Sequence, residues 1–177
     1  MQHLGLLSII LYWAYVLGII ARDRKNPAVP ISDYMLSGVR RYLYILIAAV
    51  SFTLFYLFCI YWLLPEYNLA TYVYVLMTVA YVTQLITTFT VRIGRTKQLV
   101  HDMAARISGI VAFLLLPIVA FSGEVTTTEK YILLAIYAVL TGFGWHLRRV
   151  NRPNYLPLQL GLFGSYYAAI MYLTYFS

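Results

Sequence analysis

Long uninterrupted stretches of apolar residues dominate the chain and predict its secondary structure. A helix needs about 20 apolar residues to cross the hydrocarbon core of a bilayer. Six runs approach this length, at residues 4–21, 42–64, 69–91, 103–121, 131–147 and 155–176. They lack the strict apolar and polar alternation of a membrane β-strand. The pattern therefore predicts an all-α fold, an integral membrane bundle of six transmembrane helices.

Turn and capping residues separate these runs. Pro65 is expected to end the second helix, and Pro117, inside the fourth run, is expected to produce a packing kink. The segment Thr126-Thr127-Thr128-Glu129 fits a capping box, in which a threonine hydroxyl and a glutamate bond the free N–H groups of a helix start. We therefore expect the fifth helix to begin there.

The composition changes this interpretation little. Apolar residues make up 62% of the 177 residues and charged residues only 11%, against about a quarter in soluble domains. The runs leave no room for a soluble domain, so residues 1–177 are expected to form one transmembrane domain. The first run lacks a basic flank and a cleavage site, and is interpreted as a span rather than a signal peptide. Cys59 is the only cysteine, which excludes an intrachain disulfide.

Charge distribution predicts the orientation. All of the 13 basic residues except Lys130 lie in or beside the first, third and fifth connections. Lysine and arginine accumulate in cytoplasmic loops, so these connections are expected on the cytoplasmic side and both termini on the other side. The membrane is expected to be the plasma or cytoplasmic membrane.

The net charge of +7 suggests anionic partners. Because the basic residues flank membrane spans, anionic lipid head groups are the expected partner, and nucleic acid is not. Partner membrane subunits are a further possibility. The residues expected to contact head groups are Arg22, Arg24, Lys25, Arg40, Arg41, Arg95, Lys97, Arg148, Arg149 and Arg152.

Most polar side chains suited to catalysis or ligand binding lie near the basic residues, at the expected cytoplasmic ends of the helices. The candidates expected to converge on one vestibule are Ser32, Asp33, Gln84, His101 and His146. Asp102 either neutralises Arg106 one turn later at an interfacial helix start, or forms a catalytic group with His101, Ser32 and Asp33. His101 and His146 are also candidate metal ligands. The sequence leaves these alternatives open.

Three segments carry a resemblance to a known family. They are 31–33 (Ile-Ser-Asp) before the second helix, 100–105 (Val-His-Asp-Met-Ala-Ala) followed by Leu116-Pro117, and 158–163 (Leu-Gln-Leu-Gly-Leu-Phe). Together they resemble the six-helix membrane family called domain of unknown function 998. The resemblance implies a six-helix membrane fold and no specific activity.

General features of the sequence favour some functions over others. The sequence contains no His-Glu-x-x-His, no Gly-x-Ser-x-Gly and no glycine-rich phosphate loop, and it predicts no cofactor. Short outer connections and few ionisable groups within the spans favour a non-enzymatic protein, either lipid-interacting or an accessory subunit of a membrane complex. A membrane-embedded lipid hydrolase with a polar or metal site at the cytoplasmic face is the alternative, and a small transporter is another.

Overall fold

The computed structural model describes residues 1–23, 38–90, 95–149 and 155–176, and helices account for nearly all of them. The elements are α1 (Gln2–Asp23), α2 (Gly38–Phe58), the π-helix η2 (Cys59–Leu63), α3 (Leu64–Glu66), α4 (Thr71–Phe89), α5 (Arg95–Ala120), α6 (Thr127–Arg149) and α7 (Tyr155–Tyr175). The prediction of an all-α fold is confirmed.

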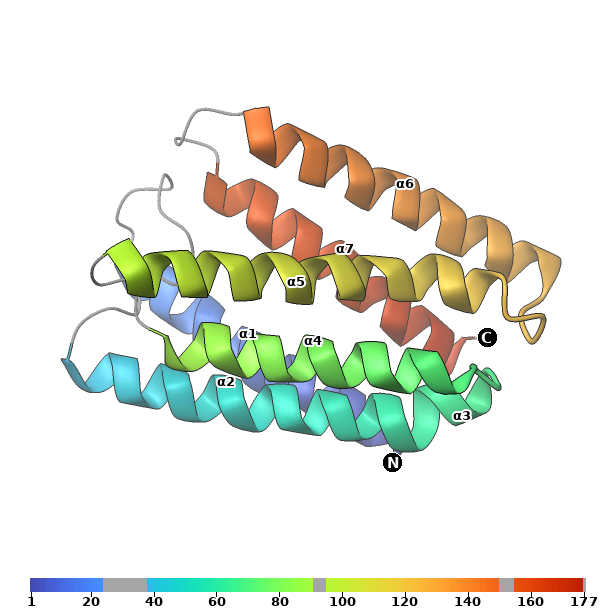
Figure 1. Ribbon diagram of the computed structural model, residues 1–177, viewed down its shortest axis with the longest axis horizontal. Coiled ribbons are helices and arrows are strands. Elements are labelled where there is room, and N and C mark those ends of the chain that lie inside the picture. The colour runs from blue at the N-terminus through green and yellow to red at the C-terminus, as the bar shows by residue number, and fades with distance from the viewer. Residues whose placement is uncertain (24–37, 91–94, 150–154, 177) are drawn as a thin grey trace.

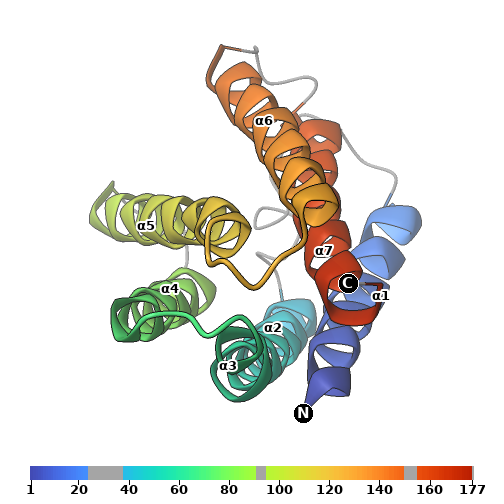
Figure 2. The same cartoon turned by 90° about the vertical axis from the view of Figure 1, so that its right-hand side faces the viewer.

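The helices form a ring in chain order. Helices α2, η2 and α3 run on from one another as one rod, and each long helix packs against the next, with α1 also touching α7. Figure 2 shows this ring end-on, and Figure 1 shows the helices running side by side along the bundle.

Both chain termini lie at the same end as α3 and the α5–α6 connection. We call this the terminal end. At the opposite end α1, α4 and α6 finish and α2, α5 and α7 start, and we call it the basic end.

The outer surface of the ring is apolar. Four helices within the described residues are long and apolar enough to cross a membrane: Gln2–Arg22, Gly38–Glu66, Thr71–Phe89 and Thr96–Ala120. Leu7, Ile10, Leu46, Val75 and Ile110 are each more than half exposed on their outer faces. A water-soluble monomer rarely exposes so much contiguous apolar surface. The molecule is therefore suited to a membrane.

The π-helix η2 accommodates Pro65 near the end of the rod formed by α2, η2 and α3. In a regular α-helix a proline ring clashes with the carbonyl four residues earlier. The wider turn of η2, at Cys59–Leu63, comes directly before α3, which contains Pro65. The rod then ends in a Schellman motif. Asn68 adopts a left-handed φ of 47°, Leu69 N–H donates to Leu64 O at 3.0 Å, and Asn68 N–H donates to Pro65 O at 3.0 Å. The expected helix end is confirmed.

The capping box at the start of α6 is also confirmed. Thr126 N–H donates to Glu129 Oε2 at 2.6 Å, and Glu129 N–H donates to Thr126 Oγ1 at 3.3 Å. Pro117 lies inside α5, which continues to Ala120, and the kink expected there stays a prediction.

The terminal half of the ring is filled with bulky side chains. Phe58, Leu63, Leu116 and Leu133 are 0% exposed, and they belong to one apolar cluster contributed by α2, η2, α3, α4, α5, α6 and α7. Gly5 of α1 lies so close to this cluster that a Cβ atom there would meet the Phe58 ring at 2.9 Å. This half of the bundle has a packed apolar core, and a more open hollow of about 440 Å³ lies at its surface between residues 68–72 and 117–122.

Candidate functional site: a cavity in the basic half

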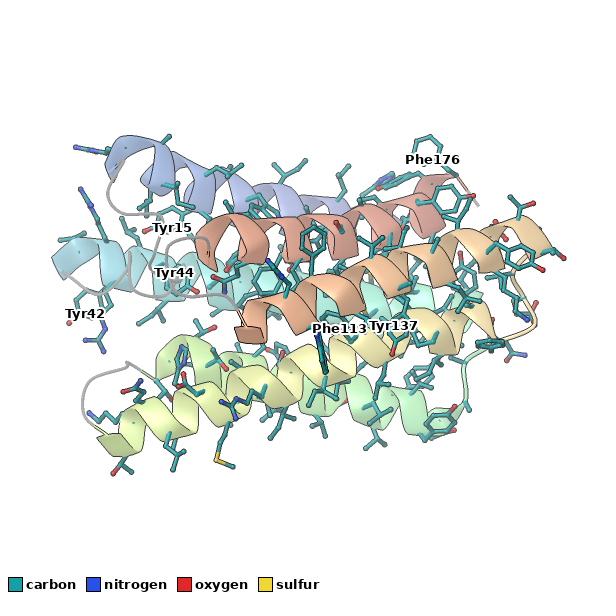
Figure 3. All side chains as sticks on the ribbon, turned by 90° about the horizontal axis from the view of Figure 1, so that it is seen from above. Tyr15, Tyr42, Tyr44, Phe113, Tyr137 and Phe176 are labelled. Atoms are coloured by element: carbon teal, nitrogen blue, oxygen red, sulfur yellow. The ribbon has the colours of Figure 1, made fainter. Side chains whose placement is uncertain are left out.

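The basic half of the ring is hollow. A cavity of about 550 Å³ lies between α1, α2, α4, α5 and α7. Its walls are rich in aromatic rings, including those of Phe52, Phe55, Phe113, Phe163, Tyr166 and Tyr167. In Figure 3 Tyr44 marks the part of α2 near the basic end and Phe113 lies about halfway along the bundle. Small-molecule sites typically enclose about 300–1,000 Å³ with mostly apolar walls.

The residues along one face of α5 explain why the interior is hollow in the basic half and packed in the terminal half. His101, Ala105, Ser108 and Ala112 follow one another at helical spacing and line the cavity. The same face continues with Leu115 and Val119, which are 1% and 0% exposed in the packed core of the terminal half. Small and polar side chains thus give way to bulky ones along a single stripe. On the neighbouring helix α4, Ala80 adds another small residue to the wall.

Gly109 widens the cavity further. It lines the space, and a Cβ atom built at this position would meet nothing within 4 Å. Close packing of a neighbour therefore does not require a glycine at position 109. A larger side chain could enter the cavity from this position without displacing a neighbour at Cβ.

A polar group joins α4 to α5 in the cavity wall. Ser108 Oγ donates to Gln84 Oε1 at 2.8 Å. About two turns closer to the basic end, His101 is only 8% exposed and its Nδ1 lies 3.2 Å from Asp102 Oδ1. Adjacent residues on a helix do not normally face each other, so sequence spacing did not suggest this contact. Arg106 also lines the cavity.

The threonines of α4 are satisfied within their own helix. Thr87 Oγ1 donates to Thr83 O and Thr88 Oγ1 donates to Gln84 O, both at 2.9 Å. Such bonds to preceding carbonyls are usual for threonine in membrane helices. The polar stripe of this helix therefore offers the Gln84 amide to the cavity more readily than its hydroxyls.

Tyrosine hydroxyls enter the cavity walls from several helices. Tyr12 of α1 and Tyr44 of α2 both line the cavity. Tyr166 is 8% exposed, and its buried hydroxyl has no hydrogen-bond partner among the described residues. Buried polar groups are nearly always paired, so an unpaired O–H beside a cavity is consistent with a partner that occupies the cavity. No tyrosine was among the candidate site residues from sequence, so this interior group was missed.

The structure brings together some of the candidate residues and not others. Gln84, His101 and Asp102 all line the cavity. His146 is exposed on α6 and is not among the lining residues, so the structure does not place it with His101. Ser32 and Asp33 lie outside the described residues. In the described parts of the chain, no three histidine, cysteine, aspartate or glutamate residues are grouped to hold a metal, and the catalytic and metal roles stay predictions.

The residues expected to contact lipid head groups are partly described. Arg22 and Lys97 are exposed, and Arg40 and Arg41 are half-buried. Helix ends place Arg95, Arg148 and Arg149 at the same basic end, whereas Arg24, Lys25 and Arg152 lie outside the described residues. The Tyr15 hydroxyl donates to Arg40 O at 2.9 Å and ties α1 to the start of α2.

No protein-family model matches the chain, and neither a curated protein nor a solved structure is detectably similar to it. The resemblance to the family called domain of unknown function 998 thus depends on its three sequence segments alone. Function has to be argued from the cavity and its walls.

Proposed function

We propose that this protein is a six-span membrane protein that holds one lipid-like, amphipathic molecule inside its helix bundle without changing it chemically. The observation that carries the proposal is the half-hollow ring, in which a cavity of about 550 Å³ has aromatic walls and a polar cluster on α4 and α5. Apolar walls with a few convergent polar groups are typical of ligand sites.

The shape of the space supports binding rather than passage. Beyond the cavity, Phe58, Leu115 and Leu116 form part of a packed apolar layer toward the terminal end. A transport path through this conformation would have to cross that layer. A site closed at one end is what a binding protein needs to retain an apolar ligand, since burial contributes about 25 cal/mol per Å² of apolar surface.

The proposal includes an orientation in the membrane. We place the basic end in the cytoplasm and both termini on the other side, with α6 and α7 spanning alongside the four more apolar helices. The support is the collection of cationic residues at one end of the bundle, together with the side-by-side arrangement of the long helices along its length (Figure 1). Anionic lipids of the inner leaflet would then surround the basic end.

A lipid hydrolase is a second candidate, favoured by the contact of His101 with Asp102. A carboxylate beside a buried imidazole can orient it and stabilise its protonated form, as general-base catalysis requires. Purified protein would then release product from a lipid ester, and His101→Gln would abolish the release. Binding without product release would favour the first candidate.

The cavity itself can be tested by filling it. Gly109→Leu adds a side chain where a Cβ meets nothing within 4 Å on a residue that lines the cavity. Gly142→Leu is the matched control, because Gly142 on α6 has equally free space and does not line the cavity. Lipids that remain bound after purification would be identified by native mass spectrometry.

We expect a discrete lipid adduct on the wild-type protein and on the Gly142→Leu variant, and its loss from the Gly109→Leu variant. Thermal unfolding of both variants in the same detergent checks that they remain folded. Equal retention of the adduct by both variants would show that the cavity is not the binding site.

A further inference from the structure

We infer that the amphipathic ligand is a single-chain lipid whose polar group is an anion, a carboxylate or a phosphate, bound at the α4–α5 wall. This inference rests on the proposed function and adds the charge and the size of the ligand. It follows from three features of the described residues: the charged side chains of the wall, the cations around the basic end, and the limited volume of the space.

A guanidinium lies among the charged side chains of the wall. His101, Asp102 and Arg106 are the charged or titratable lining residues on α5. Asp102 Oδ1 lies 3.2 Å from His101 Nδ1, so the imidazole is a close neighbour of this carboxylate in the wall. Arg106 supplies a permanent positive charge to the wall, and its planar guanidinium suits carboxylate and phosphate oxygens.

A second guanidinium points to the same ligand charge. Arg41 lies one helical turn before Tyr44, which lines the cavity, and therefore on the same side of α2. Its Nε is buried and has no hydrogen-bond partner within the described part of the chain. A buried N–H of a cation without an acceptor is costly, and an anion at the basic end of the cavity would satisfy it.

The surroundings reinforce this preference. Arg22, Arg40 and Lys97 lie at the same end of the bundle, and low-dielectric walls focus the potential of such cations into a cleft. An anionic head group is attracted to this end, whereas a cationic one is repelled.

The volume and the deeper walls define the rest of the ligand. Phe55, Phe113 and Tyr167, on α2, α5 and α7, line the part of the cavity farther from the basic end. A space of about 550 Å³ is in the range of sites for one small molecule. The ligand is therefore a single acyl chain or a comparable apolar body, and a phospholipid with two chains is not expected to be enclosed.

The experiment compares three probes that share one chain and differ in charge: hexadecanoic acid, hexadecanol and hexadecylamine. Tritiated hexadecanoic acid is bound to the purified full-length protein in detergent, and each unlabelled probe competes with it. We expect the acid to bind about tenfold more tightly than the alcohol or the amine, the size of effect that one charged hydrogen bond produces. Arg106→Gln should remove this preference and leave the affinity for hexadecanol unchanged, while Lys130→Gln removes a cation at the terminal end and should change neither.

Inorganic phosphate and acetate distinguish a lipid head group from a free anion. Neither should displace hexadecanoic acid when the ionic strength is held constant, because both lack the apolar chain. Displacement by phosphate alone would overturn the assignment to a lipid, and equal affinity for acid and alcohol would overturn the anion. Failure of the proposed function is a different result: Gly109→Leu would then weaken none of the three probes.

Discussion

The rings of Tyr56 and Tyr81 stack across α2 and α4 with their centroids 4.4 Å apart and their planes 11° from parallel. Each hydroxyl reaches a threonine of the opposite helix: Tyr56 OH lies 3.0 Å from Thr78 Oγ1, and Tyr81 OH lies 2.9 Å from Thr53 Oγ1. Both threonines donate their single proton to a carbonyl of their own helix, so they accept from the tyrosines. This reciprocal pair closes the cavity wall between the two helices.

Removing one hydroxyl of this pair should weaken the wall. We expect Tyr81→Phe to lower the free energy of unfolding by about 1 kcal/mol, because the ring stays and one interhelical hydrogen bond is lost. The measurement is equilibrium unfolding in mixed micelles. In a double-mutant cycle, Thr53→Val should then add little to Tyr81→Phe. Tyr72→Phe is the control on the same helix, since Tyr72 is 60% exposed, and an equal loss there would contradict the assignment.

Gly5 permits the close approach of α1 to Phe58. A Cβ atom at Gly5 would lie 2.9 Å from the Phe58 ring, which is completely buried and has little room to move. Gly5→Ala should therefore destabilise the protein by about 1–3 kcal/mol, the usual effect of overpacking. Gly18→Ala on the same helix adds its Cβ where nothing lies within 4 Å. The two variants should differ in thermal unfolding, and identical midpoints would show that Phe58 yields freely.

The capping box should stabilise the start of α6. Thr126→Ala removes the acceptor for Glu129 N–H, and we expect it to lower the free energy of unfolding by about 1 kcal/mol. Glu129→Gln should be tolerated better than Glu129→Ala, because glutamine can still accept from Thr126 N–H. Thr128→Ala, at an exposed position of the same turn, serves as the control. A control that loses as much stability as Thr126→Ala would exclude a role for the cap.

The proposed orientation makes opposite predictions for two exposed positions. A membrane-impermeant maleimide added outside intact cells should label Thr127→Cys, at the terminal end, and should not label Lys97→Cys, at the basic end, until the cells are opened. The native Cys59 is buried and should contribute no background. The reverse labelling pattern would invert the topology.

Anionic lipids should gather around the basic end. Each lysine or arginine near the surface contributes about 1 kcal/mol to attraction by anionic head groups, and salt screens this attraction. Purified protein should therefore enrich phosphatidylglycerol over phosphatidylcholine in its lipid shell at low salt, and less so at high salt. Arg22→Gln combined with Lys97→Gln should reduce the enrichment, because both side chains are exposed at this end. No preference at low salt would argue against an electrostatic lipid contact.

Local sequence chemistry determined the helices and their ends. Long apolar runs predicted the all-α fold, because only a helix satisfies its own backbone in lipid. The capping box at Thr126 and the helix end after Pro65 were predictable because each depends on residues within one or two turns. The run at 103–121 understated α5, which starts at Arg95, because hydropathy detects the span and not the polar turns that extend the helix.

Only the tertiary structure decided which way each helix faces. In a membrane bundle both the lipid-facing and the core-facing sides are apolar, so periodicity carries little information about rotation. Tyr67 is buried and donates to Leu173 O at 2.9 Å, whereas His146, which was expected in the vestibule, lies exposed on α6. The cavity likewise depends on five helices presenting particular faces to one another, and the small-to-bulky change along α5 acquires meaning only once that face is known to point inward.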